Sequence, residues 1–174
     1  MTRHASTAGN YHPWATYIHA REEARRRGDR RVGTEHLVLA LLRDPDLAQA
    51  LGCDLQFTRE TLDAMDRDAL VSIRIDQPLE APPVPTREPV LATKRPSFKA
   101  VLADRLPMTP VAKRVLEQSG KDGRHRRPVD RCSRERVLIA LLSLAAPDPA
   151  AALLDALGVD RGVVSERLGR PSAA

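Results

Sequence analysis

The chain has 174 residues, of which 42% are hydrophobic and only 3% aromatic, so its core must be built from aliphatic side chains, as is typical of packed helices. Its formal net charge of +5 favours acidic partners, nucleic acid among them. No run approaches the roughly 18 apolar residues of a membrane-spanning helix, no apolar stretch marks a secretory signal, and the cysteines form no CxxC pair. We therefore expect a cytoplasmic protein with free thiols, without a membrane span or a zinc site.

Composition divides the chain into five segments, because a proline-rich stretch separates two stretches with helical patterns. Six prolines lie between Gln77 and Pro96, and proline removes backbone donors and breaks helices, so this stretch should form an extended linker. A short helix is expected near its end, over residues 97–106. We expect a loose tail, a first helical unit, the linker, a second helical unit and a short tail over residues 1–14, 15–72, 73–105, 106–168 and 169–174.

The first unit should open with a helix over residues 15–27, which contain neither glycine nor proline and are followed by Gly28. Thr34 stands where the N-cap of the next helix should stand, because its hydroxyl could accept a backbone N–H. Residues 37–42 are apolar on all sides of a helix, which predicts a central, buried element.

Two more helices should complete this unit. The first begins at the Asp-Pro-Asp sequence of residues 44–46 and runs to residue 50. The turn LGCD at residues 51–54 ends it, and the second helix covers residues 58–71. Its predicted inner face consists of Leu62, Met65, Ala69 and Leu70.

The second unit repeats the first. Residues 131–142 (RCSRERVLIALL) align with residues 31–42 (RVGTEHLVLALL) at a constant offset of 100, and five of the twelve positions are identical. A second pair follows in the same order, LGVD at residues 157–160 against LGCD at residues 51–54. A repeated amphipathic unit hides its apolar face best against its twin, so we expect an all-α pair of units related by a pseudo-two-fold axis.

The sequence VGTEHLVLALL at residues 32–42 resembles the signature of the Clp N-terminal domain, also called the Clp repeat domain. AREEA at residues 20–24 and LG at residues 51–52 also match, as do TPVAKRVLE at residues 109–117 and residues 151–160 in the second unit. The resemblance covers residues 15–72 and 106–168. It implies two four-helix repeats in a domain that receives adaptors and substrates for Clp ATPases.

The resemblance also implies a receptor without a motor. The one Gly-Lys pair, Gly120-Lys121, is followed by Asp122, and Val115 stands where the first glycine of a phosphate-binding loop should stand. We therefore expect no cofactor and no catalysis, and a monomer that acts as an adaptor, a decoy or a regulator of Clp proteolysis. Its expected partners are a Clp ATPase, adaptors or substrate proteins.

Four residues are candidates for ligand binding by this resemblance. In C-type members the acidic residue of the Gly-Thr-Glu-His sequence is associated with phosphorylated arginine, and the matching positions are Glu35 and Glu135. A carboxylate can accept a forked pair of hydrogen bonds from a guanidinium, and the N–H groups of a helix start can hold a phosphate. Thr34 could add a hydroxyl, and Arg134 could hold a phosphate or pair with Glu135 and close the site.

Other interpretations remain open at this stage. A glutamate in the first turn of a helix is common because the helix dipole favours it. Tyr11 and Trp14 could pack over the first helix or form an apolar patch for a partner. The arginine runs could contact nucleic acid, although no recognition helix is evident and they also suit a solvated helix face. No HExxH, GxSxG or GxGxxG sequence is present, so an enzyme is not expected.

Overall fold

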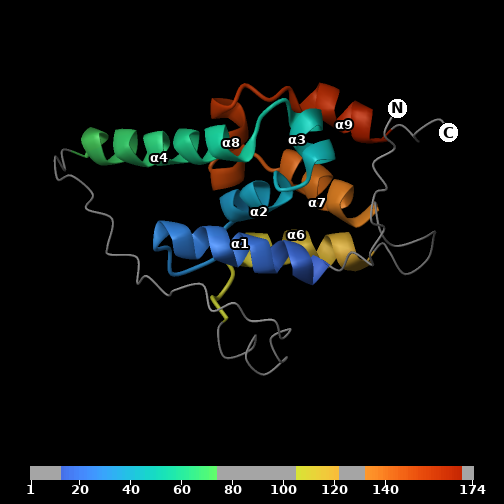
Figure 1. The fold of residues 1–174 in the computed structure, drawn as a ribbon, viewed down its shortest axis with the longest axis horizontal. Coiled ribbons are helices and arrows are strands. Elements are labelled where there is room, and N and C mark those ends of the chain that lie inside the picture. The colour runs from blue at the N-terminus through green and yellow to red at the C-terminus, as the bar shows by residue number, and fades with distance from the viewer. Residues whose placement is uncertain (1–12, 74–104, 122–131, 170–174) are drawn as a thin grey trace, which may run out of the picture.

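The computed structural model describes residues 13–73, 105–121 and 132–169, which form eight α-helices and no strand (Figure 1). The prediction of an all-α protein is confirmed for this part of the chain. The helices are α1 (Pro13–Arg27), α2 (Thr34–Leu41), α3 (Pro45–Leu51), α4 (Leu55–Ser72), α6 (Pro110–Lys121), α7 (Cys132–Leu142), α8 (Pro149–Ala156) and α9 (Arg161–Gly169). None of the helices in the described ranges is both long and apolar enough to cross a membrane.

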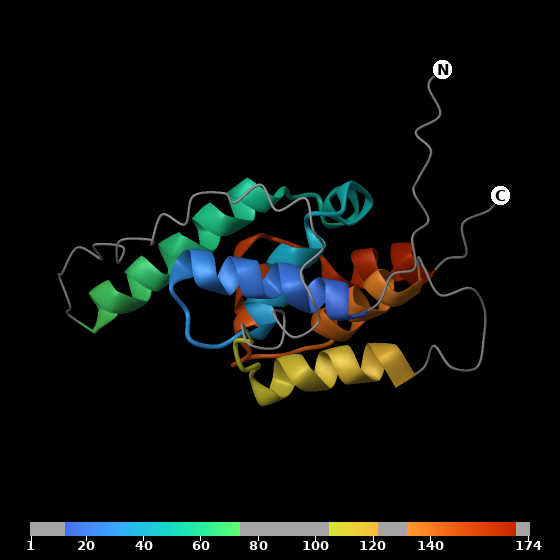
Figure 2. The same ribbon diagram turned by 60° about the horizontal axis from the view of Figure 1, so that its bottom comes forward.

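Helix α2 lies at the centre of the fold, as its apolar sequence predicts. Every residue of α2 except Glu35 is buried, and the helix contacts α1, α4, α6, α7 and α8. Helices α1 and α6 lie side by side along one flank, and α4 extends outward beyond the other helices (Figures 1 and 2). Among the described residues, the buried hydrophobic side chains are aliphatic apart from Tyr17, whose hydroxyl donates to the carbonyl of Leu106 at 2.8 Å.

Short backbone contacts join the segment before α6 to the segment before α2. The N–H of Val32 donates to the carbonyl of Pro107, and the N–H of Thr109 donates to the carbonyl of Val32, each at 2.9 Å. These bonds form one isolated parallel bridge between Val32 and Met108. Residues 106–109, which follow the predicted linker, are therefore hydrogen-bonded to the first unit.

The turn LGCD and its repeat LGVD have the same local structure. Gly52 and Gly158 have positive φ values of 72° and 68°, a left-handed conformation that glycine adopts without a steric penalty. Two residues later, the carboxylates of Asp54 and Asp160 accept the backbone N–H of Phe57 and Val163. Both turns therefore end one helix, as predicted, and in both the aspartate also caps the next helix.

Several predicted boundaries are wrong by a few residues. Helix α1 begins at Pro13 and not at residue 15, because proline suits a first turn. Helix α4 begins at Leu55 and not at residue 58, because Asp54 caps it. Ala69, predicted on the inner face of α4, is exposed. The expected helix over residues 97–106 lies outside the described residues up to 104, and residues 105 and 106 are not helical.

Candidate functional site

The start of α2 is built differently from the prediction. Gly33, not Thr34, is the N-cap residue, in an extended conformation with φ −96° and ψ −179°. Its backbone N–H donates to Nδ1 of the buried His36 at 3.0 Å, and Nε2 of His36 lies 2.9 Å from the Asp29 carboxylate. The imidazole thus satisfies the N–H of the N-cap residue itself, and the Thr34 hydroxyl bonds to another partner.

That partner lies in the second half of the chain. The Thr34 hydroxyl donates to Oδ1 of Asp148 at 2.7 Å, and the same oxygen accepts the N–H of Ala150 at 2.9 Å. Asp148 is the N-cap residue of α8 and precedes Pro149. Thr34, with 2% of its surface exposed, is therefore buried where α2 packs against α8.

Arg134 makes the reciprocal contact. Its guanidinium forms an ion pair with the carboxylate of Asp44, the N-cap residue of α3, which precedes Pro45. Arg134 occupies the position that matches Thr34, and both residues contact an aspartate that starts a short helix in the opposite half. We call these two contacts the seam pairs, Thr34–Asp148 and Arg134–Asp44. Thr34–Asp148 joins the two halves through a hydrogen bond from a hydroxyl, and Arg134–Asp44 joins them through an ion pair.

The two glutamates predicted to bind ligand each follow a residue of a seam pair in the sequence. The Glu35 carboxylate folds back over Gly33, with Oε1 2.9 Å from Nδ1 of His36. Its other oxygen, Oε2, is buried and has no hydrogen-bond partner within the described residues. Glu135 lies in the first turn of α7, is partly buried and already interacts with another group.

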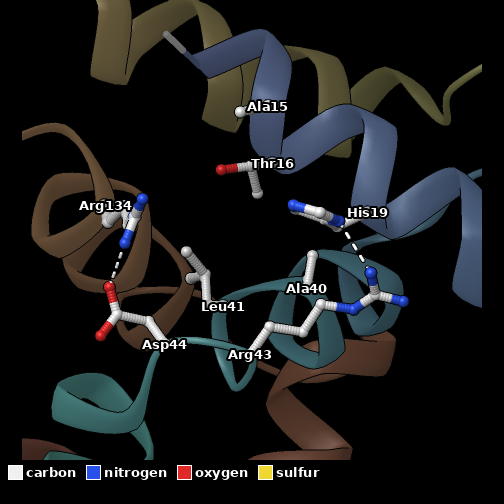
Figure 3. Close-up of a pocket in the computed structure, with 8 residues that line it drawn as sticks. All are labelled: Ala15, Thr16, His19, Ala40, Leu41, Arg43, Asp44 and Arg134. Carbon is white, nitrogen blue, oxygen red and sulfur yellow. Dashed lines mark hydrogen bonds and ion pairs between the residues drawn. The ribbon is translucent and has the colours of Figure 1, made fainter. Parts of the chain in front are cut away.

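A cavity of about 110 Å³ opens beside the Arg134–Asp44 pair (Figure 3). Its lining comes from α1, from the end of α2, from the turn that follows and from α7. Among the four predicted site residues, only Arg134 reaches it. The complete lining is Ala15, Thr16, His19, Ala40, Leu41, Arg43, Asp44 and Arg134.

Arg43, on one side of this cavity, belongs to a network around the buried carboxylate of Glu23. That carboxylate accepts from Arg43 at 2.9 Å and from Arg59 at 2.6 and 2.9 Å, and Arg26 lies 3.3 Å away. Burial alone would raise the pKa of Glu23, but the hydrogen bonds and charges of Arg59 and Arg43 outweigh it and lower the pKa to about 2. Glu23 therefore stays ionised and links α1 to α4 and to the turn that follows α2.

No family model matches this chain. A search of curated proteins also finds no significant match. In the described ranges no cluster of three or more His, Cys, Asp or Glu side chains could hold a metal ion. Cys53 is a partly buried free thiol, and burial raises its pKa. Tyr11 lies outside the described residues, and the position of the Trp14 side chain is not described either.

Sequence reasoning missed most of this cavity. Thr16 and His19 lie on α1, more than 20 residues from Arg43 and Asp44, and no short-range pattern joins them. The local sequence at Asp44 indicates only a helix start. The available signal was the repeated Asp-Pro at residues 44–45 and 148–149, since two helix starts that repeat in a paired fold should lie at equivalent places in the two halves.

Proposed function

We propose that this chain is a double Clp repeat that binds polypeptides and acts as an adaptor, decoy or regulator of Clp proteolysis. The proposal begins from the sequence at residues 32–42 and its counterpart at residues 131–142. It includes the finer architecture, in which two four-helix repeats, α1 to α4 and α6 to α9, are related by a pseudo-two-fold axis. Binding, and not catalysis, is the proposed role.

The seam pairs carry this proposal. Exchanging position 34 with 134, and Asp44 with Asp148, converts one pair into the other. Two unrelated helical units packed together would have no reason to bring matching positions to matching partners. The reciprocity supports a duplicated unit packed on its twin, which is the arrangement that the resemblance implies.

Contacts between whole helices give the same support. Helix α3 contacts α9, and α4 contacts α8, which is the pattern expected when each half places its third helix against the fourth helix of the other. Likewise α1 contacts α7 and α2 contacts α6. The central pair α2 and α7 contact each other, as do the outer pair α1 and α6. The matching pattern supports a pseudo-two-fold axis that passes between α2 and α7.

The proposed phosphoarginine site rests on Glu35 more than on the other three residues. Its Oε2 atom has no partner in the described structure, and an unsatisfied carboxylate oxygen costs stability unless a donor reaches it. A guanidinium group would supply that donor. Thr34 and Arg134 are both engaged in the seam pairs, so they would have to leave Asp148 and Asp44 before contacting a ligand.

The direct test is a titration of the full chain with a fluorescent peptide that contains one phosphoarginine. We expect saturable binding that is lost in Glu35→Gln and retained in Glu60→Gln, a matched change on α4. Peptides with arginine or phosphoserine at the same position serve as ligand controls. Equal binding of all three peptides, or no effect of Glu35→Gln, would remove the phosphoarginine part of the proposal.

The wider role is tested by affinity capture from the source cells, with the Thr34→Val and Glu35→Gln variants processed in parallel. Enrichment of a Clp ATPase, its adaptors or its substrates by the unaltered chain is the expected result. Recovery of none of these in repeated captures would count against a role in Clp proteolysis, even if the duplicated architecture were correct.

Binding to nucleic acid is the second candidate function, and the exposed Arg30 and Arg31 after α1 favour it. The neighbouring arginines weaken the case, because Arg26 pairs with Glu23 and Arg27 pairs with three aspartates, Asp29, Asp63 and Asp66. A gel shift with duplex DNA and single-stranded RNA at increasing salt separates the candidates. Tight binding that weakens steeply with salt, and weakens further in a double Arg30→Gln, Arg31→Gln variant, would favour nucleic acid.

A further inference from the structure

We propose that the cavity between α1, α2 and α7 binds a carboxylate group of a polypeptide, either an acidic side chain or a C-terminus. The site is distinct from the start of α2, where Glu35 lies. The inference rests on the proposed function only for the source of the carboxylate, because the binding chemistry comes from the cavity itself. Its occupant would enter beside Arg134 and compete with Asp44.

Hydrogen-bond donors converge on this cavity from two elements. Nη1 of Arg43 lies 2.8 Å from Nδ1 of His19, and a guanidinium can only donate, so Nδ1 accepts and Nε2 carries the ring proton. Figure 3 shows the second ring nitrogen of His19 and the Thr16 hydroxyl on the side that faces Arg134. An imidazole N–H, a hydroxyl and a guanidinium therefore surround the opening, and an acceptor with two oxygens suits them.

The ion pair beside the cavity indicates which acceptor this is. Arg134 already binds one carboxylate, that of Asp44, so its guanidinium is placed for planar, charge-assisted pairing. The Arg134 side chain is 43% exposed and that of Asp44 only 19%, so a carboxylate arriving from solvent can reach the guanidinium and compete with Asp44 for it. Asp44 would then be a resident competitor that the ligand partly replaces.

The size and floor of the cavity set the chemical class of ligand. About 110 Å³ is room for a few water molecules or one small polar group, and not for an aromatic side chain. The floor is apolar, formed by Ala40 and Leu41, with Ala15 at the side. A carboxylate on one or two methylenes, as in aspartate, glutamate or a chain terminus, matches both the donors and the floor.

The test uses three short probes and the isotope-labelled full chain. The first peptide is Ac-Gly-Gly-Asp-Gly-Gly-NH2, the second carries asparagine in place of aspartate, and the third is Ac-Gly-Gly-Gly-Gly with a free C-terminus. Amide shifts of Ala15, Thr16, Ala40 and Leu41 report binding. We expect saturable shifts with the aspartate peptide, the free C-terminus or both, and none with the asparagine peptide. These arms also distinguish the two sources of the carboxylate.

The decisive variant removes the resident competitor. Asp44→Asn keeps the N-cap of α3, because asparagine caps as well as aspartate, but it gives up the charge that occupies Arg134. We expect it to bind the carboxylate probe about tenfold more tightly. Asp46→Asn is the matched control, since it changes the charge equally two residues away and outside the lining. Equal effects of the two changes would mean general electrostatics and would overturn the proposal.

Two loss variants complete the test. Arg134→Gln should weaken carboxylate binding about tenfold or more, whereas Arg136→Gln, on the same helix but outside the lining, should not. Ala15→Leu should block the cavity while leaving both guanidiniums in place. Probe binding that survives Ala15→Leu and Arg134→Gln would refute the site. Failure to capture Clp proteins with probe binding intact would refute only the proposed function, so the two claims fail separately.

Discussion

The hydroxyl of Thr34 and the carboxylate of Asp148 are joined by a 2.7 Å hydrogen bond across 114 residues of sequence. The bond connects the first residue of α2 to the N-cap of α8, so one carboxylate serves a helix start in its own half and a hydroxyl in the other. Because Thr34 is buried, water cannot easily replace this contact. The relationship makes the packing of the two halves sensitive to a single oxygen atom.

Replacing Thr34 with valine should therefore destabilise the fold. The change keeps the shape and removes the hydroxyl, so Asp148 loses one donor and the free energy of unfolding should fall by about 1 kcal/mol. Urea unfolding followed by circular dichroism measures this. Thr61→Val is the control, because the Thr61 hydroxyl bonds only to the carbonyl of Phe57 in its own helix, and a change within about 0.5 kcal/mol is expected there. Equal losses in both variants would contradict a special role for the seam pair.

Glu23 should make the fold sensitive to acid. Its pKa in the folded state is about 2, below the ordinary 4.5, so its contribution is complete above pH 4.5 and is lost as the pH falls toward 2. A shift of this size corresponds to roughly 3 kcal/mol of stability at neutral pH. Urea unfolding between pH 7 and pH 2 should show the loss.

Other carboxylates also titrate in this range, so the Glu23→Gln variant isolates the effect. At pH 7 it should cost about 3 kcal/mol, because the arginines around Glu23 lose their counter-charge. The difference between the variant and the unaltered chain should shrink as the pH falls toward 2. Glu117→Gln, which alters an exposed pair with Lys113, should give nearly parallel pH curves. A constant difference for Glu23→Gln at all pH values would show that its charge is not the cause.

The two left-handed glycines should respond alike to substitution. A Cβ atom at Gly52 or Gly158 meets nothing within 4 Å, so any cost of alanine comes from the positive φ and not from packing. We expect Gly52→Ala and Gly158→Ala each to lower the free energy of unfolding by about 1 kcal/mol. Asparagine at either position should cost less, because it tolerates this conformation better. Thermal unfolding gives the comparison, and a cost confined to one glycine would contradict equivalent turns.

Gly33 should control the position of Glu35. A Cβ atom at Gly33 would overlap the carboxylate of Glu35, so any larger residue must displace this flexible side chain. Serine is a favoured N-cap residue and stands at the matching position 133, so Gly33→Ser should change the unfolding free energy by less than about 1 kcal/mol. It should nevertheless alter the ring resonances of His36 and weaken phosphoarginine binding. Unchanged binding would show that Glu35 does not need its present position.

Helix placement was largely predictable from local sequence. Residues 37–42 are apolar around the whole helix, and they form a buried central helix because no other environment accepts such a surface. Gly52 and Asp54 mark a helix end and a helix start for local steric and hydrogen-bonding reasons. The prediction of Thr34 as the N-cap of α2 was wrong, because the Thr34 hydroxyl bonds to Asp148 in the other half, a contact that local sequence does not reveal.

The predicted site was less accessible to sequence reasoning. Glu35 and Glu135 could be named as candidates from their position in a first turn, but the burial of one Glu35 oxygen depends on Gly33 and His36 around it. The occupation of Arg134 by Asp44 could not be foreseen, because the two residues are 90 positions apart. The same distance hid the cavity beside them.

The amino-acid sequence by itself determined the helices, their order and the repetition of one unit, because periodicity, caps and breakers act over a few residues. Tertiary packing alone decided which partner each polar side chain found. Thr34 went to Asp148 and Arg134 to Asp44 because burying the two apolar faces together brought those groups within hydrogen-bond distance. Burial makes an unpaired polar group costly, so the packed chain, and not the local sequence, fixed those pairs.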